Sequence, residues 1–258
     1  MPPDTWNPTQ YEKFRREREQ PFLDLLALIQ PSAGMRIVDL GCGTGKPTRL
    51  AHERFGAVET VGIDRSASML AAAGTDLPAG LRFEVGTIEE FRAPRPVDLI
   101  LSNAAFHWVE DHERLLARLA GSLTPRGQLA FQIPAMHDSL SHTVADDLAA
   151  GEFRGDFGGW RRPQPVHPPE AYARWLHRYG FAEQSVRLVV YPHLLPVRDD
   201  VVEWMKGTLL TEYDRHLPPG RFAPFLEAYS GRLVPQLEDE RPFFFPFKRI
   251  LCWGRRDS

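Results

Sequence analysis

Residues 36–45 read Arg-Ile-Val-Asp-Leu-Gly-Cys-Gly-Thr-Gly, a short apolar run with β-branched residues that ends in three glycines at alternate positions. An apolar run of this length is typical of a buried strand in a parallel sheet. The glycines allow a sharp turn and let a ligand approach the backbone. Leu50, Ala51 and Phe55 then provide one face of a predicted helix. The loop therefore lies between a strand and a helix N-terminus, where N–H groups and the helix dipole favour an anionic group.

The spacing of the glycines argues against two common nucleotide motifs. A dinucleotide fingerprint needs a small residue where the chain has Lys46, and a phosphate-binding P-loop needs Gly and Ser or Thr where it has Leu40 and Pro47. What remains is Asp-x-Gly-x-Gly-x-Gly from Asp39, followed about 20 residues later by a second predicted strand that ends in Asp64. This pattern resembles the S-adenosylmethionine site of class I methyltransferases, with dinucleotide binding or an inert turn as the alternatives.

The composition is that of an ordinary globular protein. The chain has 258 residues, of which 43% are hydrophobic and 25% charged, and a formal charge of −3. We expect no nucleic-acid or membrane partner from this charge, and no apolar segment approaches the ~20 residues of a membrane span. The N-terminus lacks a signal-peptide pattern, and the two cysteines form no metal-like cluster. We therefore expect a cytoplasmic protein without a metal site, and leave its oligomeric state open.

Strand and helix patterns alternate along most of the chain. Further strands are predicted over 58–63, 81–85, 97–101, 129–133, 181–191 and 243–253, and helices begin at Pro21, Ser66, Asp111 and Pro168. This order predicts an α/β fold with a mostly parallel sheet flanked by helices. The resemblance to class I methyltransferases implies that the sheet has seven strands and that the fold is their Rossmann-like one. Ligands of such sheets bind at the carboxyl ends of the strands.

Three segments fall outside this alternation. Residues 135–168 lack steady periodicity and are interpreted as an irregular insertion, and residues 197–240 carry two amphipathic helices before the last strand. We expect both to be substrate-covering insertions, and residues 1–30 to form an N-terminal lid and first helix. The whole chain, 1–258, is then a single methyltransferase domain.

Softer features narrow the resemblance to one family. The chain resembles the trans-aconitate 2-methyltransferases, small-molecule enzymes that esterify a carboxylate; the residues that carry this likeness include Trp6-Asn7-Pro8, Tyr11, Phe14, Asn103-Ala104 and Trp108. It departs from the family at Gln20, where an arginine is usual, and at 207–212. Fewer arginines mean fewer donors for gripping several carboxylates.

The resemblance also implies roles in the site. It places Gly41, Gly43 and Gly45 beside the methionine part of the cofactor, Asp64 at the ribose, and Asn103 and Ala104 beneath the sulfonium. Tyr11 and Arg18 would close over the cofactor. The full predicted cofactor set is Tyr11, Arg18, Asp39, Gly41, Cys42, Gly43, Gly45, Asp64, Arg65, Met69, Thr87, Ile88, Asn103 and Ala104. Thr87 stands where an aspartate is frequent, and Glu89 could replace it.

The expected reaction is methylation of a small-molecule carboxylic acid with S-adenosylmethionine, at Asn103, His107 and Trp108. A carboxylate is ionised at neutral pH and needs no base. A hydroxyl or amine acceptor would need one, and His107 is then the candidate. A protein that binds the cofactor without turning it over is the remaining alternative.

Overall fold

The computed structural model describes the backbone of residues 15–257 and the side chains of residues 19–257. The chain divides into two compact units. The core unit contains residues 18–134, 165–189 and 249–258, and the insertion unit includes residues 135–164 and 190–248. The prediction of a single domain, with insertions that cover the substrate, stays a prediction.

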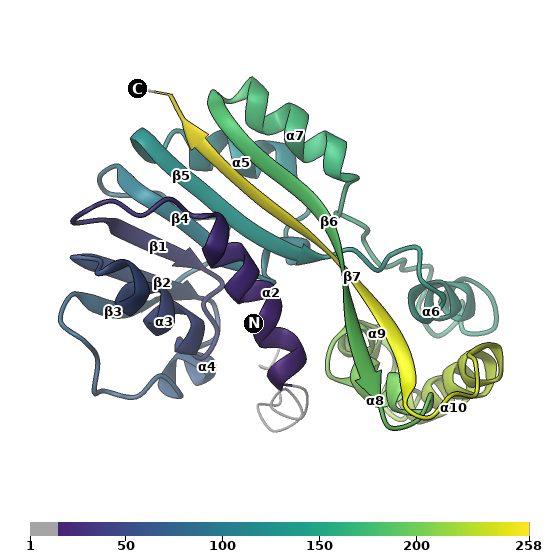
Figure 1. Ribbon diagram of the computed structural model, residues 1–258. Helices are drawn as coiled ribbons and strands as arrows, with labels where there is room; N and C mark the ends of the chain where they lie inside the picture. The colour runs from purple at the N-terminus through teal and green to yellow at the C-terminus, as the bar shows by residue number, and fades with distance from the viewer. Residues whose placement is uncertain (1–14, 258) are drawn as a thin grey trace. The chain divides into compact units, whose positions relative to one another are not determined.

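The seven strands form one sheet with the order β3-β2-β1-β4-β5-β7-β6 (Figure 1). Their bounds are β1 (Arg36–Leu40), β2 (Glu59–Asp64), β3 (Leu81–Val85), β4 (Val97–Asn103), β5 (Leu123–Pro134), β6 (Phe181–Leu195) and β7 (Phe243–Arg256). The β1–β2, β1–β4, β2–β3 and β4–β5 pairs are parallel, and β7 is antiparallel to β5. The predicted mostly parallel seven-stranded sheet is confirmed.

Helices cover both faces of this sheet in the core unit. They are α2 (Arg15–Leu28), α3 (Lys46–Phe55), α4 (Ala67–Ala71), α5 (His112–Ala120) and α7 (Pro169–Arg178). Ala130 of β5 belongs to a buried cluster with Leu25 and Leu26 of α2, whereas the next residue, Phe131, contacts Tyr172 of α7. Successive strand residues therefore pack against opposite layers, as the period of two requires.

Two local predictions in the core unit are wrong. The first helix begins before Pro21, which lies inside α2. A proline within a helix removes one backbone donor and crowds the carbonyl four residues earlier. The buried residues Phe22, Leu25 and Leu26 nevertheless hold this helix on the sheet. In α3, Ala51 is buried and Phe55 packs against the same cluster, as predicted, but Leu50 is 41% exposed and His52 is buried. The buried face of α3 is therefore offset from the predicted one.

The insertion unit is helical. It contains α6 (Leu140–Ala150), α8 (Asp200–Lys206), α9 (Leu209–His216), α10 (Phe222–Leu233) and a short 3₁₀ turn, η2 (Val234–Gln236). The prediction of irregular structure over 135–168 is thus wrong at α6, where Val144, Ala145 and Leu148 provide a buried face. The two helices predicted over 197–240 are three in the structure, because α8 ends at Lys206, with Gly207 as its C-cap, and α9 begins at Leu209.

Large aromatic side chains of this unit pack into its core. Trp204, Tyr213, Phe225 and Tyr229 are each at most 1% exposed and belong to one cluster. Along the chain, α8, α9 and α10 lie between β6 and β7, which agrees with the predicted helical insertion before the last strand. Within the described residues, we find no helix with the length and apolar character of a membrane span.

Candidate functional site

The loop after β1 is held against the end of β2 by its own backbone. The N–H groups of Gly41 and Cys42 both donate to the carbonyl oxygen of Ile63, at 2.8 and 3.1 Å. Gly41, Gly43 and Gly45 have φ values of 76°, 56° and 74°, in the left-handed region that favours glycine. The chain therefore turns sharply at the carboxyl end of the central strand, where ligands of such sheets bind.

The three glycines are needed for different reasons. A Cβ atom on Gly41 would lie 2.2 Å from the Cβ of Ala105, and one on Gly45 would lie 2.4 Å from the ring of Phe83. At Gly43 the nearest atom is the Cε of Met69, at an ordinary 3.5 Å. Protein packing thus excludes a side chain at the first and third glycines. Gly43 is the position where a ligand can best approach the backbone.

Asp64 is fixed in place at the end of β2. One carboxylate oxygen accepts a hydrogen bond from the N–H of Gly43 at 2.8 Å, and the other accepts from the N–H of Ser66 at 2.9 Å. The side chain therefore links the glycine loop to the start of α4. This is the position from which a carboxylate can accept hydrogen bonds from ribose hydroxyls.

Asp39 is buried beneath the loop and is 1% exposed. Its Oδ2 accepts a 2.6 Å hydrogen bond from the hydroxyl of Thr48, and no described residue donates to its Oδ1. Burial, opposed by this hydrogen bond and reinforced by the charge of Asp64, raises the pKa of Asp39 to about 7. Burial also raises the pKa of the Cys42 thiol far above its usual range, so this thiol stays protonated.

Met69 and Ile88 lie close to the glycine loop, as the resemblance implies. Met69 follows Ser66, whose hydroxyl accepts from the Met69 N–H at 3.1 Å and caps α4. The Cδ1 of Ile88 would lie 3.6 Å from a Cβ atom on Gly41. Arg65 is exposed, and the Thr87 hydroxyl accepts from the N–H of Glu90 at 3.2 Å. Thr87 thus stabilises a turn in the place where the family often has an acid.

The end of β4 is strained. Ala104 has a φ of 54°, an uncommon value for a residue with a side chain, and its N–H donates to the carbonyl of Gln132 at 2.9 Å. The Nε2 of Gln132 donates to the Oδ1 of Asn103 at 2.6 Å. Asn103 and Ala104 thus leave the sheet beside Ala105, which touches Gly41. Such strain persists where the surroundings fix it, and it clusters at functional sites.

A buried histidine supports the 3₁₀ turn that follows, η1 (Phe106–Trp108). The Nε2 of His112 bonds to the carbonyl of Phe106 at 2.8 Å, so Nε2 carries the proton. Its Nδ1 then accepts from the hydroxyl of Tyr172 at 2.6 Å, and that hydroxyl accepts from the N–H of His167 at 3.1 Å. Burial lowers the pKa of His112 to about 4. The rings of His107 and Trp108 in the turn lie 4.7 Å apart.

The structure thus brings together most of the predicted site. The loop 41–45, Asp64, Met69, Ile88 and Asn103–Ala104 converge at the carboxyl ends of β1, β2 and β4. Tyr11 lies outside the described residues, as does the side chain of Arg18. Sequence reasoning missed Gln132, His112 and Tyr172. Gln132 lies 29 residues from Asn103, and His112 lies 60 residues from Tyr172, so no local pattern joins these pairs. The only signal near His112 was Asp111, which was predicted to begin a helix and which caps the N-terminus of α5.

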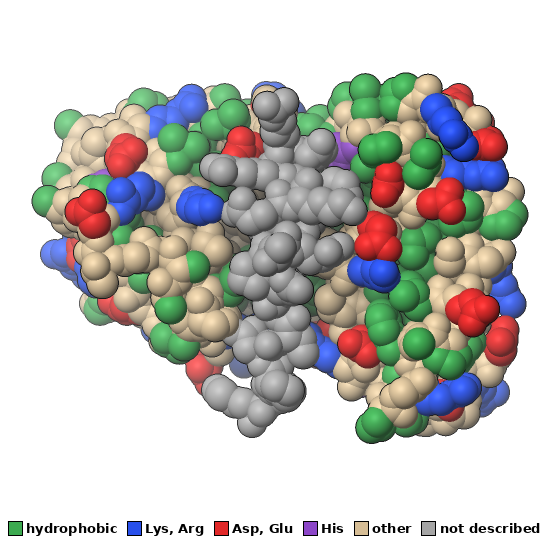
Figure 2. Space-filling view, turned by 90° about the horizontal axis from the view of Figure 1, so that it is seen from below, with side chains coloured by type: hydrophobic (Ala, Val, Ile, Leu, Met, Phe, Trp, Pro, Cys, Tyr) green, Lys and Arg blue, Asp and Glu red, His purple; other side chains and the backbone are tan. Residues whose placement is uncertain are grey.

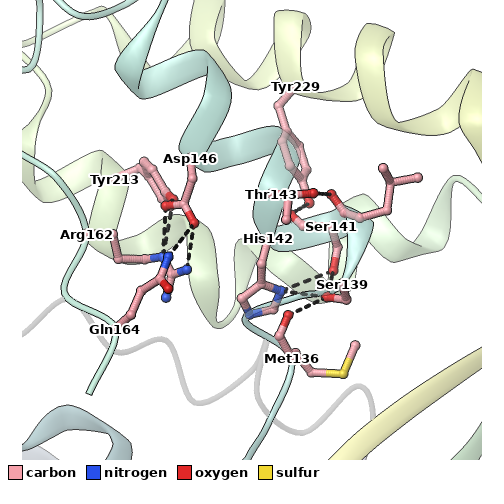
Figure 3. Close-up of polar contacts among 11 residues, drawn as sticks. Met136, Ser139, Ser141, His142, Thr143, Asp146, Arg162, Gln164, Tyr213 and Tyr229 are labelled. Carbon is pink, nitrogen blue, oxygen red and sulfur yellow. Dashed lines mark hydrogen bonds and ion pairs between the residues drawn. The ribbon is translucent and has the colours of Figure 1, made fainter. Parts of the chain in front are cut away.

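The insertion unit has a polar cluster of its own on α6 (Figure 3). Arg162, Gln164 and Tyr213 converge on Asp146, with 2.8 Å between the Arg162 Nη2 and Oδ2 and 2.5 Å between the Tyr213 hydroxyl and Oδ1. One turn earlier, the Nδ1 of His142 lies 3.1 Å from the hydroxyl of Ser139. Burial, reinforced by the charge of Arg162, lowers the pKa of His142 to about 3. These contacts fix α6 within its own unit.

Charge is mixed on the one face of the molecule that Figure 2 draws. On the face drawn in Figure 2, Lys and Arg side chains alternate with Asp and Glu side chains, and neither sign forms a continuous patch. Across residues 19–257, no three His, Cys, Asp or Glu side chains are grouped as a metal site would require. The expectations about nucleic acid and metal stay predictions.

Comparisons with known proteins agree with this geometry. Residues 37–127 match the family model described as a methyltransferase domain. The chain is 42% identical to the trans-aconitate 2-methyltransferase of Deinococcus radiodurans and 35% identical to that of Streptomyces avermitilis, in each case over 98% of both chains.

Two solved structures show the same fold at low identity. The YcgJ protein of Bacillus subtilis is 18% identical with a TM-score of 0.62, over 93% of this chain and 99% of that one. Phosphoethanolamine N-methyltransferase 2 of Haemonchus contortus, solved with S-adenosylhomocysteine, is 17% identical with a TM-score of 0.60, over 93% of this chain and 53% of that one. The predicted fold class is therefore confirmed.

Proposed function

Because this chain belongs to the trans-aconitate 2-methyltransferase family, we propose that it transfers a methyl group to a carboxylate of a small organic acid. The predictions of a methyltransferase and of S-adenosylmethionine as its cofactor are confirmed. The observation that carries the proposal is that Gly41–Gly45, Asp64 and Asn103–Ala104 meet at the carboxyl ends of neighbouring strands. The chain is also similar over 98% of its length to proteins named trans-aconitate 2-methyltransferase.

The residues at this edge suit the cofactor. The open backbone at Gly43 can accommodate the methionine part, and Asp64 is already oriented by two backbone N–H groups. We propose that Met69 and Ile88 contact the adenine, that Arg65 and Thr87 flank it, and that Asp39 and Cys42 support the loop from beneath. Tyr11 and Arg18 remain proposed contacts by resemblance. When bound, the cofactor supplies a methyl carbon activated by its sulfonium.

The chain's own contribution is alignment. A carboxylate nucleophile is ionised at neutral pH, so Asn103, His107 and Trp108 need only hold it in line and exclude water. Correct alignment can contribute roughly 7–11 kcal/mol to the lowering of the barrier. The strained Ala104 and the His112 network keep the Asn103–Trp108 segment in one conformation, which is what alignment requires.

A second acceptor class is a hydroxyl or amine. What favours it is the position of His107 in the turn directly after Asn103, where a base could reach an acceptor proton. A protein that only binds the cofactor is a third hypothesis. Full-length similarity to proteins named as methyltransferases argues against it.

The test is transfer of a labelled methyl group from S-adenosylmethionine to trans-aconitate, scored as volatile methanol after mild base. We expect a base-labile product, because methyl esters hydrolyse whereas ethers and amines do not. A negative control is Asp64→Asn, which keeps the size of the side chain but places an NH2 group against the N–H of Gly43 or of Ser66. We expect it to lose cofactor binding and methyl transfer together. A base-stable product from a different acceptor would overturn the carboxylate proposal and leave the methyltransferase standing.

A further inference from the structure

Three side chains from neighbouring strands form a hydrogen-bonded chain that ends at the proposed site. The Nη1 of Arg249 in β7 donates to the Oε1 of Gln132 in β5 at 2.9 Å, and the Nε2 of Gln132 donates to the Oδ1 of Asn103 at the end of β4 at 2.6 Å. Gln132 and Arg249 are 1% and 5% exposed. Asn103 is half-buried and pairs with Gln132 in the sheet register.

The chemistry of arginine fixes the direction of this chain. A guanidinium has five donors and no acceptor, so the atom of Gln132 that faces Arg249 must be oxygen. The amide nitrogen of Gln132 then faces Asn103, and the atom of Asn103 that receives it must also be oxygen. The amide orientations of both residues are therefore set by the charge on Arg249.

As a result, the hydrogen-bonded chain ends in a donor group, the amide nitrogen of Asn103. The Nδ2 group of Asn103 is turned away from Gln132, and it donates to no described residue. Each bond in the chain polarises the next, so the positive charge of Arg249 strengthens the donor character of Asn103. A donor of this kind fits a carboxylate oxygen.

We propose that Arg249 and Gln132 are positioning residues that present the Asn103 amide as a hydrogen-bond donor to the acceptor carboxylate. This inference rests on the proposed function and specifies it further. One carboxylate oxygen would take the methyl group as the bond between that carbon and the sulfonium sulfur breaks and neutral S-adenosylhomocysteine leaves, while the other oxygen accepts from Asn103. The preference for an anionic acceptor thus arises from Asn103, Gln132 and Arg249, which lie on three strands of the core unit. It does not require an arginine at position 20 or within 207–212.

The decisive variant is Gln132→Glu. It keeps the length and shape of the side chain and places two oxygens between Arg249 and Asn103, so the pairing with Arg249 becomes a salt bridge. The Asn103 amide must then turn its nitrogen inward and its oxygen toward the acceptor. We expect the dissociation constant of the acid from the S-adenosylhomocysteine complex, and its KM, to rise on the order of tenfold to a hundredfold. The affinity for S-adenosylhomocysteine alone should change far less than the affinity for the acid.

A matched control is Gln128→Glu, in the same strand. Gln128 is also buried, and its amide bridges the backbone of Gln30 and the indole of Trp253. We expect this variant to lower the melting temperature but to leave acid binding intact. Arg249→Met should weaken acid binding as Gln132→Glu does, and Arg249→Lys, which keeps a charged donor, should recover part of it.

The dissociation constant of the acid distinguishes failure of the proposed function from failure of the inference about Gln132 and Arg249. If the wild-type complex neither binds nor methylates trans-aconitate or simpler di- and monocarboxylates, the proposed function fails and this inference fails with it. If the wild type binds an acid and Gln132→Glu binds it equally well, only the inference is overturned, and the chain of hydrogen bonds serves to join the strands. A rise in the acid's dissociation constant confined to the Gln132 and Arg249 variants supports the inference.

Discussion

Two strand ends of the core unit, those of β1 and β4, are built in different ways. The loop after β1 is shaped by backbone conformation, and its main polar partner, Asp64, lies 21 residues away from Gly43. The end of β4 is shaped by side chains whose partners lie far along the sequence: Gln132 is 29 residues from Asn103, and Arg249 is 117 residues from Gln132. In the proposed site, the loop after β1 leaves room for the ligand beside the backbone, whereas the end of β4 presents a polar side chain to it.

The largest effect is expected at the backbone-built end. Gly41→Ala introduces a Cβ atom 2.2 Å from that of Ala105 at a φ of 76°, so the β1 loop and the end of β4 cannot both keep their places. We expect loss of the folded, cofactor-binding protein, measured by thermal melting and by S-adenosylhomocysteine titration.

Alanine substitutions at two other glycines provide comparisons for the stability loss in Gly41→Ala. Gly56→Ala, at a φ of 55° with nothing within 4 Å, should cost only about 1 kcal/mol of stability, the strain of the left-handed conformation. Gly43→Ala should cost a similar amount but also weaken cofactor binding, since a ligand approaches there. If Gly41→Ala melts like Gly56→Ala, the packing argument for the first glycine is wrong.

The second prediction concerns Asp39 beneath the β1 loop. Its pKa is raised from 3.8 to about 7, so the folded state binds more protons than the unfolded state between these values. Its contribution to the free energy of unfolding should therefore fall by about 4 kcal/mol as the pH rises from below 4 to above 7. Asp39→Asn, which can still accept from Thr48, should lack this component in denaturant melts across the pH range. Equal slopes for the two proteins would contradict it.

The third prediction has the opposite sign and concerns the β4 end. Burial lowers the pKa of His112 from 6.5 to about 4, so the unfolded state binds more protons in this range. The contribution of His112 to stability is complete above pH 6.5 and should be lost, by about 3 kcal/mol, as the pH falls through 4. His112→Gln should be less sensitive to acid than the wild type. A variant that loses stability in parallel with the wild type would show that the ring is not held neutral.

The same contrast explains what the sequence could predict. The strand, the glycine turn, Asp64 and the cap at Ser66 are local patterns, and all four are present in the structure. Pro21 and α6 were misjudged because tertiary packing, through Phe22 and Leu25 or through Val144 and Leu148, outweighs a local signal. The roles of Gln132, His112 and Arg249 depend on pairings that only the folded sheet creates. No spacing in the sequence marks them.

The smallest effect is expected at His107, and it decides between the acceptor classes. If the acceptor is a carboxylate, no proton has to be removed, and His107→Asn removes the ring contact with Trp108 but no catalytic base. We then expect kcat to fall no more than a few-fold, with no change in its pH profile between pH 6 and 9. A general base contributes roughly 10²–10⁴-fold. A loss of that size, together with the disappearance of an ionisation from the pH profile, would show that the reaction depends on proton removal by His107 and not on the hydrogen bond from Asn103. The acceptor would then be a hydroxyl or amine, and the β4 end would provide a base instead of a donor.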